Sequence, residues 1–260
     1  MTRFEEGCIV RDKGLVLCML VALAQSATSA EIKILSPGAL RSTLMEVVPT
    51  FEKETGHSVQ IQYAAAGPLA GRISKGEVAD VAILSRADVD RLVKDGLIRG
   101  GDNPDIARVG IGVMVRKGAQ KPDISNVDNL KAALRSAKTI GIANPTQGAA
   151  GAYLAKTFTL WGMDEELKPK IRALTPGDGL YAGVEKGVAE IGFAPVSEIL
   201  ARKDTLELVG PVPADMQSYN LFAAGVLVVS KEPSAAAALL RFLTSAPVAP
   251  VLQQNGLEAR

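Results

Sequence analysis

From Glu31 onward, short apolar runs alternate with segments in which apolar residues recur every three or four positions. The first pattern predicts buried strands, and the second predicts helices with one buried face. Such alternation is typical of an α/β protein with a parallel sheet and right-handed crossovers. Pro49 is expected to kink one of these helices or divide it at Val48, because proline has no amide hydrogen. In the first part of the chain, the predicted strands are 32–35, 59–63 and 81–84, and the predicted helices are 39–54, 68–74 and a segment carrying Val89, Leu92, Val93 and Leu97.

The same alternation starts again after an apolar stretch, Val109 to Val115, which predicts a connection into a second lobe. Two crossings of the chain, near Gly110–Gly112 and Asn220–Gly225, would form a hinge between the lobes. We therefore assign residues 31–110 and 222–260 to the first lobe and residues 111–221 to the second. Further predicted strands are 139–143, 189–194, 206–209 and 221–229, and further predicted helices are 127–136, 151–161, 179–186, 196–202, 234–244 and 249–255.

The region before Glu31 contains an apolar run, Gly14 to Ala24, that is too short to span a bilayer. Small residues follow as far as Ala30, so we predict a secretory signal peptide over residues 1–30 and a periplasmic location for the mature protein. The alternative, a buried core helix, is disfavoured because the run ends at small residues and polar Gln25 without a helix cap.

Composition narrows the classes of function. Both cysteines, Cys8 and Cys18, lie inside the predicted signal peptide, so the mature chain is expected to have no thiol and to depend on apolar burial for its stability. The formal net charge of the whole chain is +1, which provides no basic excess for binding nucleic acid. Because no second long apolar run follows, we predict no stable insertion into a membrane.

Small and polar residues follow each predicted strand of the first lobe. At the carboxyl ends of parallel strands, helix N-terminal N–H groups often face a common ligand, so we predict an anion site at these turns. Each turn taken alone is also consistent with an ordinary helix N-cap, worth about 1 kcal/mol. The two arginines at these turns, Arg41 and Arg86, could each donate a pair of hydrogen bonds to a carboxylate, or could simply lie on the solvated surface of a helix. The candidate ligand-binding residues of this lobe are Ser36, Gly38, Ala39, Arg41, Ala66, Gly67, Pro68, Ser85 and Arg86.

Two turns of the second lobe occupy corresponding positions. Residues 144–151 lie between a strand and a helix, and their small side chains let backbone N–H groups approach a ligand; the alternative is a flexible connection. Residues 195–198 offer a hydroxyl and a carboxylate, although Glu198 could serve only to favour the N-terminus of its helix. The candidate ligand-binding residues here are Thr146, Gln147, Gly148, Ala150, Gly151, Pro195 and Ser197.

Several chemistries lack the residues they need. His57 is the only histidine, and it precedes a strand, which places it at the sheet edge opposite the predicted site. Without a second histidine or a cysteine in the mature chain, neither a zinc site nor Ser-His-Asp catalysis is predicted. Gly67 to Ser74 lacks the ending of a phosphate-binding loop, and no dinucleotide fingerprint follows the first strand. We therefore predict no metal and no cofactor.

A family signal lies in the segments LSPGAL (35–40), FEKETG (51–56), AAGPLA (65–70), GEVADV (76–81) and GVAEIG (187–192). These segments resemble the periplasmic molybdate-binding proteins and their relatives, and the similarity extends over essentially the whole mature chain. The resemblance implies a two-lobed type II periplasmic binding fold, in which mainly parallel sheets flanked by helices close on an oxyanion held by serine hydroxyls and backbone N–H groups. It also implies a monomer that works with an ABC-type permease.

The chain departs from the molybdate-binding pattern at two places. Its second loop reads Ala65-Ala66-Gly67 where that family carries a Ser-Ser-Gly-like loop, and Pro195 stands where we align the family's tyrosine. Each absent donor is expected to cost about 1–3 kcal/mol if an oxygen of the ligand stays unpaired. The departures therefore favour a carboxylate over molybdate or tungstate as the ligand.

An offshoot of the same family, the exported aconitate isomerases, resembles the chain even more closely. This resemblance implies that the same cleft could move a proton and a double bond in a tricarboxylate, which requires carboxylate anchors and a general base. Glu198, Asp178 and Tyr181 are the candidate catalytic residues, although the loop carrying the last two could serve only as a helix cap.

The leading hypothesis is a periplasmic solute-binding protein that delivers a small anion, with a carboxylate preferred, to an ABC permease. The alternative is a periplasmic isomerase of the aconitate isomerase type that uses the same cleft. The effector domain of a transcription regulator shares the architecture but is disfavoured, because the chain carries a predicted signal peptide instead of a DNA-binding segment.

Overall fold

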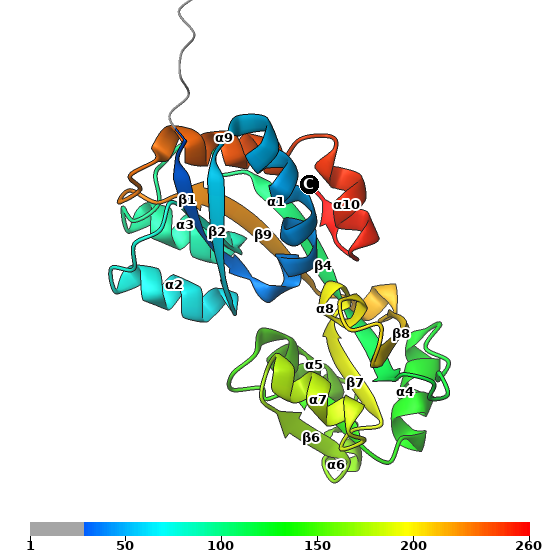
Figure 1. Cartoon of the computed structure of the whole chain (residues 1–260). Helices are drawn as coiled ribbons and strands as arrows, with labels where there is room; N and C mark the ends of the chain where they lie inside the picture. Colours follow the sequence, from blue (N-terminus) through cyan, green and yellow to red (C-terminus); the bar gives the residue numbers. More distant parts are fainter. Residues whose placement is uncertain (1–28) are drawn as a thin grey trace, which may run out of the picture.

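The computed structural model describes residues 29–260, so the signal-peptide prediction falls, except for Ser29 and Ala30, outside the described residues. Strands and helices alternate in two lobes that are joined along one long strand, β4 (Asp105–Arg116) (Figure 1). The first lobe contains β1 (Glu31–Pro37), η1 (Gly38–Leu40), α1 (Arg41–Thr55), β2 (Ser58–Ala64), α2 (Ala66–Ser74), β3 (Val81–Ser85), α3 (Arg86–Lys94), β9 (Tyr219–Val226), α9 (Pro233–Leu243), α10 (Val248–Gln254) and β10 (Glu258–Ala259). The second lobe contains α4 (Val127–Ser136), β5 (Ile140–Ala143), α5 (Ala149–Leu160), α6 (Asp164–Leu167), β6 (Ile171–Leu174), α7 (Asp178–Glu185), β7 (Ile191–Pro195), α8 (Val196–Leu200), β8 (Leu206–Pro211) and η2 (Ala214–Met216).

The described strands join in the order β2-β1-β3-β9-β4-β7-β5-β6, and β8 and β10 also pair with β4. In the first lobe, β1 is parallel to β2 and β3, whereas β9 is antiparallel to β3 and β4. In the second lobe, β5 is parallel to β6 and β7, whereas β4 is antiparallel to β7 and β8. The predicted two-lobed α/β fold is therefore confirmed, with mixed sheets in which the antiparallel strands β4 and β9 lie beside the parallel ones.

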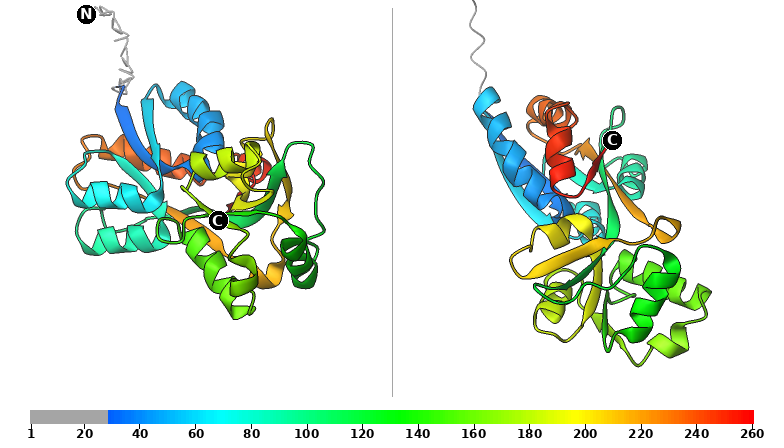
Figure 2. Two further views of the ribbon diagram at one scale, coloured as in Figure 1. Left: turned by 90° about the horizontal axis from the view of Figure 1, so that it is seen from below. Right: turned by 90° about the vertical axis from the view of Figure 1, so that its right-hand side faces the viewer.

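Helices cover both faces of the sheet in each lobe (Figure 1; Figure 2). In the first lobe, α1, α9 and α10 bury residues such as Phe51 and Leu239 against one face, and α2 and α3 cover the other. In the second lobe, α4, α5 and α6 cover one face, with Phe158 in the core, and α7 and α8 cover the other. Within residues 29–260, no single helix has the length and apolar content to cross a membrane. Helices α9 and α10 have the required length and apolar content only when taken together, and the pair is bent by 64°.

Two local differences from the sequence-based prediction have physical causes. Helix α1 continues through Pro49, so of the two predicted outcomes, a kink or a division at Val48, the division is wrong. Pro49 and Met45 are both exposed, and water can therefore bond the Met45 carbonyl that proline leaves without a helical partner. The hydrophobic pattern also fails to predict α6, β6 and β10, because these elements are short and largely polar or half-buried.

The second connection between the lobes lies earlier than predicted. Residues 219–226 form β9 in the first-lobe sheet, so the connection lies just before the predicted stretch Asn220–Gly225, between Pro211 and Tyr219. The first connection lies inside β4, which pairs with β9 as far as Gly110 and with β7 from Ile111 onward. The exact lobe boundaries at residues 110 and 221 stay a prediction.

Gln217 ties the two connections together. Its side-chain oxygen accepts a hydrogen bond from the Ile111 N–H with an N···O distance of 2.7 Å, and its amide nitrogen donates to the Ile111 carbonyl at 3.0 Å. A Cβ atom on Gly110 would lie 2.8 Å from the amide carbon of Gln217. Glycine at this position therefore leaves the room that the Gln217 side chain occupies.

Candidate functional site

The carboxyl ends of the parallel strands in the two lobes face each other across the hinge. Strand β3 ends at Ser85, which pairs with Phe222, and Phe222 pairs in turn with Ala107 of β4. Strand β7 runs the opposite way along β4 and ends at Pro195, which pairs with Ile111. At about 3.3 Å per residue, the four steps from Ala107 to Ile111 separate the two edges by roughly 13 Å along β4. The predicted ligand loops therefore lie at the two sheet edges that face each other along β4.

The turn after β1 presents a cation beside a buried hydroxyl. Ser36 is fully buried, and its hydroxyl donates a 3.3 Å hydrogen bond to the carbonyl of the next residue. Gly38 and Ala39 form part of η1, and Arg41 opens α1 with an exposed side chain. The Arg41 guanidinium lies 4.2 Å from the centre of the Tyr63 ring, at the end of the neighbouring strand.

The turn after β2 lies beside the first, because β1 and β2 pair in register up to their last residues. Ala66, Gly67 and Pro68 form the first turn of α2, and the last two are exposed. Ala65, which precedes the helix, provides no side-chain cap. This turn can therefore offer backbone N–H groups of Ala66 and Gly67 to a ligand, but no hydroxyl, and Pro68 has no N–H to give.

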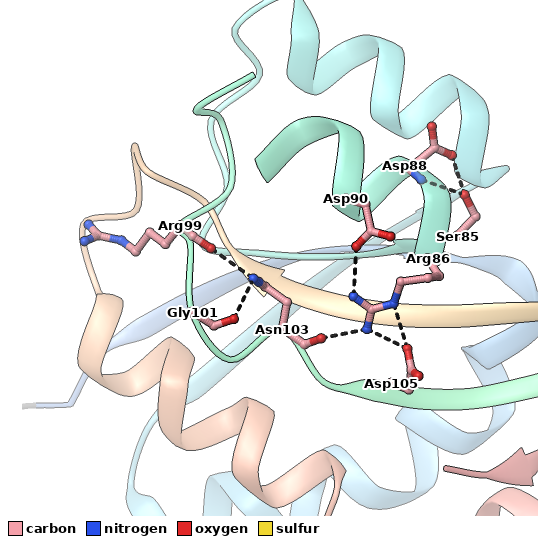
Figure 3. Close-up of polar contacts among 8 residues, drawn as sticks. All are labelled: Ser85, Arg86, Asp88, Asp90, Arg99, Gly101, Asn103 and Asp105. Carbon is pink, nitrogen blue, oxygen red and sulfur yellow. Dashed lines mark hydrogen bonds and ion pairs between the residues drawn. The ribbon is translucent and has the colours of Figure 1, made fainter. Parts of the chain in front are cut away.

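Ser85 and Arg86 are engaged by local partners (Figure 3). The Ser85 hydroxyl accepts a hydrogen bond from the Asp88 N–H at 3.2 Å and donates to the Asp88 carboxylate at 2.7 Å, as a helix N-cap does. The Arg86 guanidinium donates to the Asp105 carboxylate at 2.5 Å and to the Asn103 carbonyl at 2.7 Å. These contacts hold α3 against the start of β4. Ligand binding by Ser85 and Arg86 stays a prediction that these contacts do not favour.

The loop before α5 is held together by its own hydrogen bonds. The Asn144 side-chain oxygen accepts from the backbone N–H of Thr146 at 3.1 Å and from its hydroxyl at 3.0 Å. The Gly148 N–H donates to the Asn144 carbonyl at 3.0 Å, while Thr146 and Gln147 are exposed. These bonds favour a defined turn over the alternative of a flexible connection.

Gly151 lets the first turn of α5 pack directly on the end of β5. A Cβ atom at this position would lie 1.8 Å from the Ala143 carbonyl oxygen. Gly151→Ala is expected to lower the free energy of unfolding by about 1–3 kcal/mol and to displace this turn. Thermal unfolding of the variant measures the effect, with Gly71→Ala of α2 as the control because nothing lies within 4 Å of the Cβ position there. An unchanged melting temperature for Gly151→Ala would contradict this packing.

A small cavity of about 50 Å³ lies beside the hinge and is lined from both lobes. It brings together the predicted residues Ala150 and Pro195. Three polar residues of its wall, Tyr153, Ser218 and Asn220, were not predicted from the sequence. Tyr153 lies in an ordinary helical pattern, and the only signal for Ser218 and Asn220 is their polarity just before the apolar run of β9. The hydroxyl of Tyr153 donates to the Met216 carbonyl at 2.7 Å. The lining residues are Val109, Gly110, Ile111, Ala150, Tyr153, Pro195, Ser218 and Asn220.

The three candidate catalytic residues lie in one cluster on α7 and α8. The Tyr181 hydroxyl donates to the Glu198 carboxylate with an O···O distance of 2.5 Å. Arg202 lies 3.9 Å above the Tyr181 ring and pairs with the exposed Asp178 at 2.5 Å. Burial and then the Glu198 charge raise the pKa of Tyr181 far above its ordinary value, so the phenol stays protonated at neutral pH. A Cβ atom on Gly38 would lie 3.8 Å from the other Glu198 oxygen, which places this carboxylate against the first ligand loop.

Ser197 lies at a contact between the lobes. Its hydroxyl is buried and has no hydrogen-bond partner among residues 29–260. A Cβ atom on Gly256, in the turn before β10, would lie 3.3 Å from the Ser197 backbone nitrogen. Helix α8 therefore packs against the turn before β10 in the first lobe. A role for Ser197 in ligand binding stays a prediction.

His57 lies at the opposite end of the first-lobe sheet, just before β2, where its Nδ1 atom accepts a hydrogen bond from the Ala30 N–H at 3.2 Å. Across residues 29–260, no group of three or more His, Cys, Asp or Glu side chains is arranged to hold a metal ion.

Comparison with known proteins agrees with this geometry. The family model for bacterial extracellular solute-binding proteins matches residues 32–258. The chain is 31% identical over 254 residues to an aconitate isomerase from a Pseudomonas species, which covers 94% of each chain. It is 27% identical over 240 residues to the molybdate-binding protein ModA of Azotobacter vinelandii, covering 90% of this chain and 92% of that protein.

Solved structures share the same architecture. The periplasmic molybdate-binding protein of Azotobacter vinelandii superposes with a TM-score of 0.73 at 19% identity, covering 88% of this chain and 99% of that one. The sulfate-binding protein SubI of Mycobacterium tuberculosis superposes with a TM-score of 0.69 at 18% identity, covering 88% of this chain and 87% of that one. With a family match over nearly the whole described chain and this two-lobed type II fold, the protein belongs to the bacterial extracellular solute-binding proteins.

Proposed function

We propose that this protein captures a small carboxylate anion between its two lobes in the periplasm and presents it, as a monomer, to an ABC-type permease. The observation that carries the proposal is the opposition of the strand ends, with the loops after β1, β2 and β3 facing those after β5 and β7 across roughly 13 Å of β4. Binding would close the hinge through contacts that only the closed state makes.

The choice of a carboxylate over an oxyanion rests on the donors that line the first lobe. The loop after β2 offers alanine and glycine instead of serine hydroxyls, whereas the loop after β1 carries the exposed guanidinium of Arg41. A guanidinium matches the two oxygens of a carboxylate with paired hydrogen bonds. An anion with several carboxylates would therefore use Arg41 in place of the missing hydroxyls.

Arg41→Ala is expected to weaken binding of the cognate carboxylate by about 10- to 100-fold, because it removes charge-assisted hydrogen bonds. Ser36→Ala is expected to weaken it by about 5-fold. Titration calorimetry with trans-aconitate, cis-aconitate, citrate, sulfate and molybdate measures both effects and identifies the ligand class. Arg241→Ala, an exposed arginine on α9, is the matched control. Binding of molybdate without a response to any carboxylate would refute the proposal.

A second candidate function, isomerisation of aconitate, is favoured by the Tyr181–Glu198 pair and by the 31% identity to an aconitate isomerase. In this reaction the Glu198 carboxylate takes a proton from the methylene carbon, and the electron pair moves to form the new double bond. The proton is then delivered to the CH carbon at the far end of the original double bond, which becomes the new methylene. Atoms and charge therefore balance without an oxidant. Tyr181, kept protonated, would hold Glu198 in place by its hydrogen bond.

The isomerase candidate is tested by incubating the purified protein with trans-aconitate and following the appearance of the cis isomer. Turnover would make the protein an enzyme. Tight binding of aconitate without turnover would leave it a transport-binding protein.

A further inference from the structure

Arg41 differs from several other arginines of the chain in having no acidic partner. Arg72 pairs with Glu77 and Arg202 pairs with Asp178, whereas Arg41 forms no ion pair with any residue in the range 29–260. Its guanidinium instead lies 4.2 Å from the centre of the Tyr63 ring. An aromatic ring attracts the guanidinium without neutralising its charge, and it leaves the N–H groups available to donate hydrogen bonds to a carboxylate.

Tyr63 is well fixed where it stands. It lies near the end of β2, directly opposite Ser36 of β1, and packs against the first-lobe core. Its hydroxyl is buried and has no hydrogen-bond partner among residues 29–260, and burial raises the pKa of Tyr63 against the opposing effect of Arg41. Because the hydroxyl makes no bond, the contribution of this side chain to Arg41 comes from its ring.

We propose that Tyr63 is a positioning residue whose aromatic face holds the Arg41 guanidinium ready for a carboxylate group of the ligand. The inference rests on the proposed capture of a carboxylate between the lobes. A long arginine side chain held over a ring loses less conformational freedom on binding than one that moves freely. The ring of Tyr63 therefore sets affinity through Arg41, without contact between Tyr63 and the ligand.

A double-mutant cycle tests the proposal, with binding of trans-aconitate and citrate measured by calorimetry. Tyr63→Leu, which removes the ring, is expected to weaken binding by about 5- to 30-fold. Tyr63→Phe, which keeps the ring and removes the unbonded hydroxyl, is expected to stay within about 3-fold of the wild type and to keep or raise the melting temperature. In an Arg41→Ala background, Tyr63→Leu is expected to change affinity by less than about 2-fold.

A merely structural role for Tyr63 gives a different pattern. Equal losses from Tyr63→Leu with and without Arg41 would overturn the proposal, as would a loss in Tyr63→Phe as large as in Tyr63→Leu. If the wild type binds sulfate or molybdate but no carboxylate, the proposed function fails, and the same cycle run with that anion still decides whether the ring acts through Arg41. A wild type that binds none of these anions refutes both.

Discussion

Under the second candidate function, Glu198→Gln is expected to slow the interconversion of trans- and cis-aconitate by about 10²- to 10⁴-fold, the usual contribution of a general base. Glutamine has the same shape and can still accept the hydrogen bond from Tyr181, so the fold and the affinity for aconitate should change little. The rate is measured with purified protein at saturating substrate, and affinity is measured separately by calorimetry.

The control for this prediction is Asp178→Asn in the same cluster. Asp178 is exposed and pairs with Arg202, so its loss should reduce the rate by no more than a few-fold. Full activity in Glu198→Gln would show that Glu198 is not the base. A greater loss of activity in Asp178→Asn than in Glu198→Gln would show the same.

Asp80→Ala is expected to destabilise the first lobe by about 3 kcal/mol, because the buried Asp80 carboxylate joins three segments of the chain. One of its oxygens accepts from the Lys33 N–H at 2.9 Å, and the other accepts from the Ser230 hydroxyl at 2.7 Å and the Lys231 N–H at 3.2 Å. Truncation leaves these donors without their acceptor. For a chain of this size the melting temperature should fall by about 6–12 °C.

Asp90→Ala provides the comparison for that measurement. Asp90 is exposed on α3 and forms only a 3.2 Å pair with Arg86, so its melting temperature should fall by no more than about 2 °C. Equal melting temperatures for the Asp80 and Asp90 variants would show that the buried carboxylate does not hold the lobe together.

The fold was accessible from sequence because its strands and helices carry strong periodicity. Helix α4 spans Val127–Ser136, the predicted range, and its buried residues Leu130 and Leu134 recur at helical spacing. By contrast, β6 has no fully buried residue, so its pattern carries no strand signal. The crossing before β9 was misplaced because Tyr219 and Asn220 are exposed and polar although they pair with β4.

The candidate site was only partly accessible from sequence. The positions of loops at strand ends follow from the order of the elements, and this predicted Ser36, Arg41 and Glu198 at the two facing sheet edges. Partners distant in sequence do not follow from local pattern. Asp105, which engages Arg86, is nineteen residues away from it, and sequence alone could not show that this arginine is already occupied.

The continuity of β4 through both sheets has a mechanical consequence. Any rotation of one lobe against the other must twist a single uninterrupted ribbon, and the twist will concentrate where cross-strand backbone bonds are replaced by a side chain. One such place is the N–H of Ile111, which is bonded to the side-chain amide of Gln217, although the Ile111 carbonyl also accepts from the Val212 N–H. A side-chain amide can turn with the strand while keeping its bond, so at Ile111 a rotation of the lobes meets a side chain that can follow it.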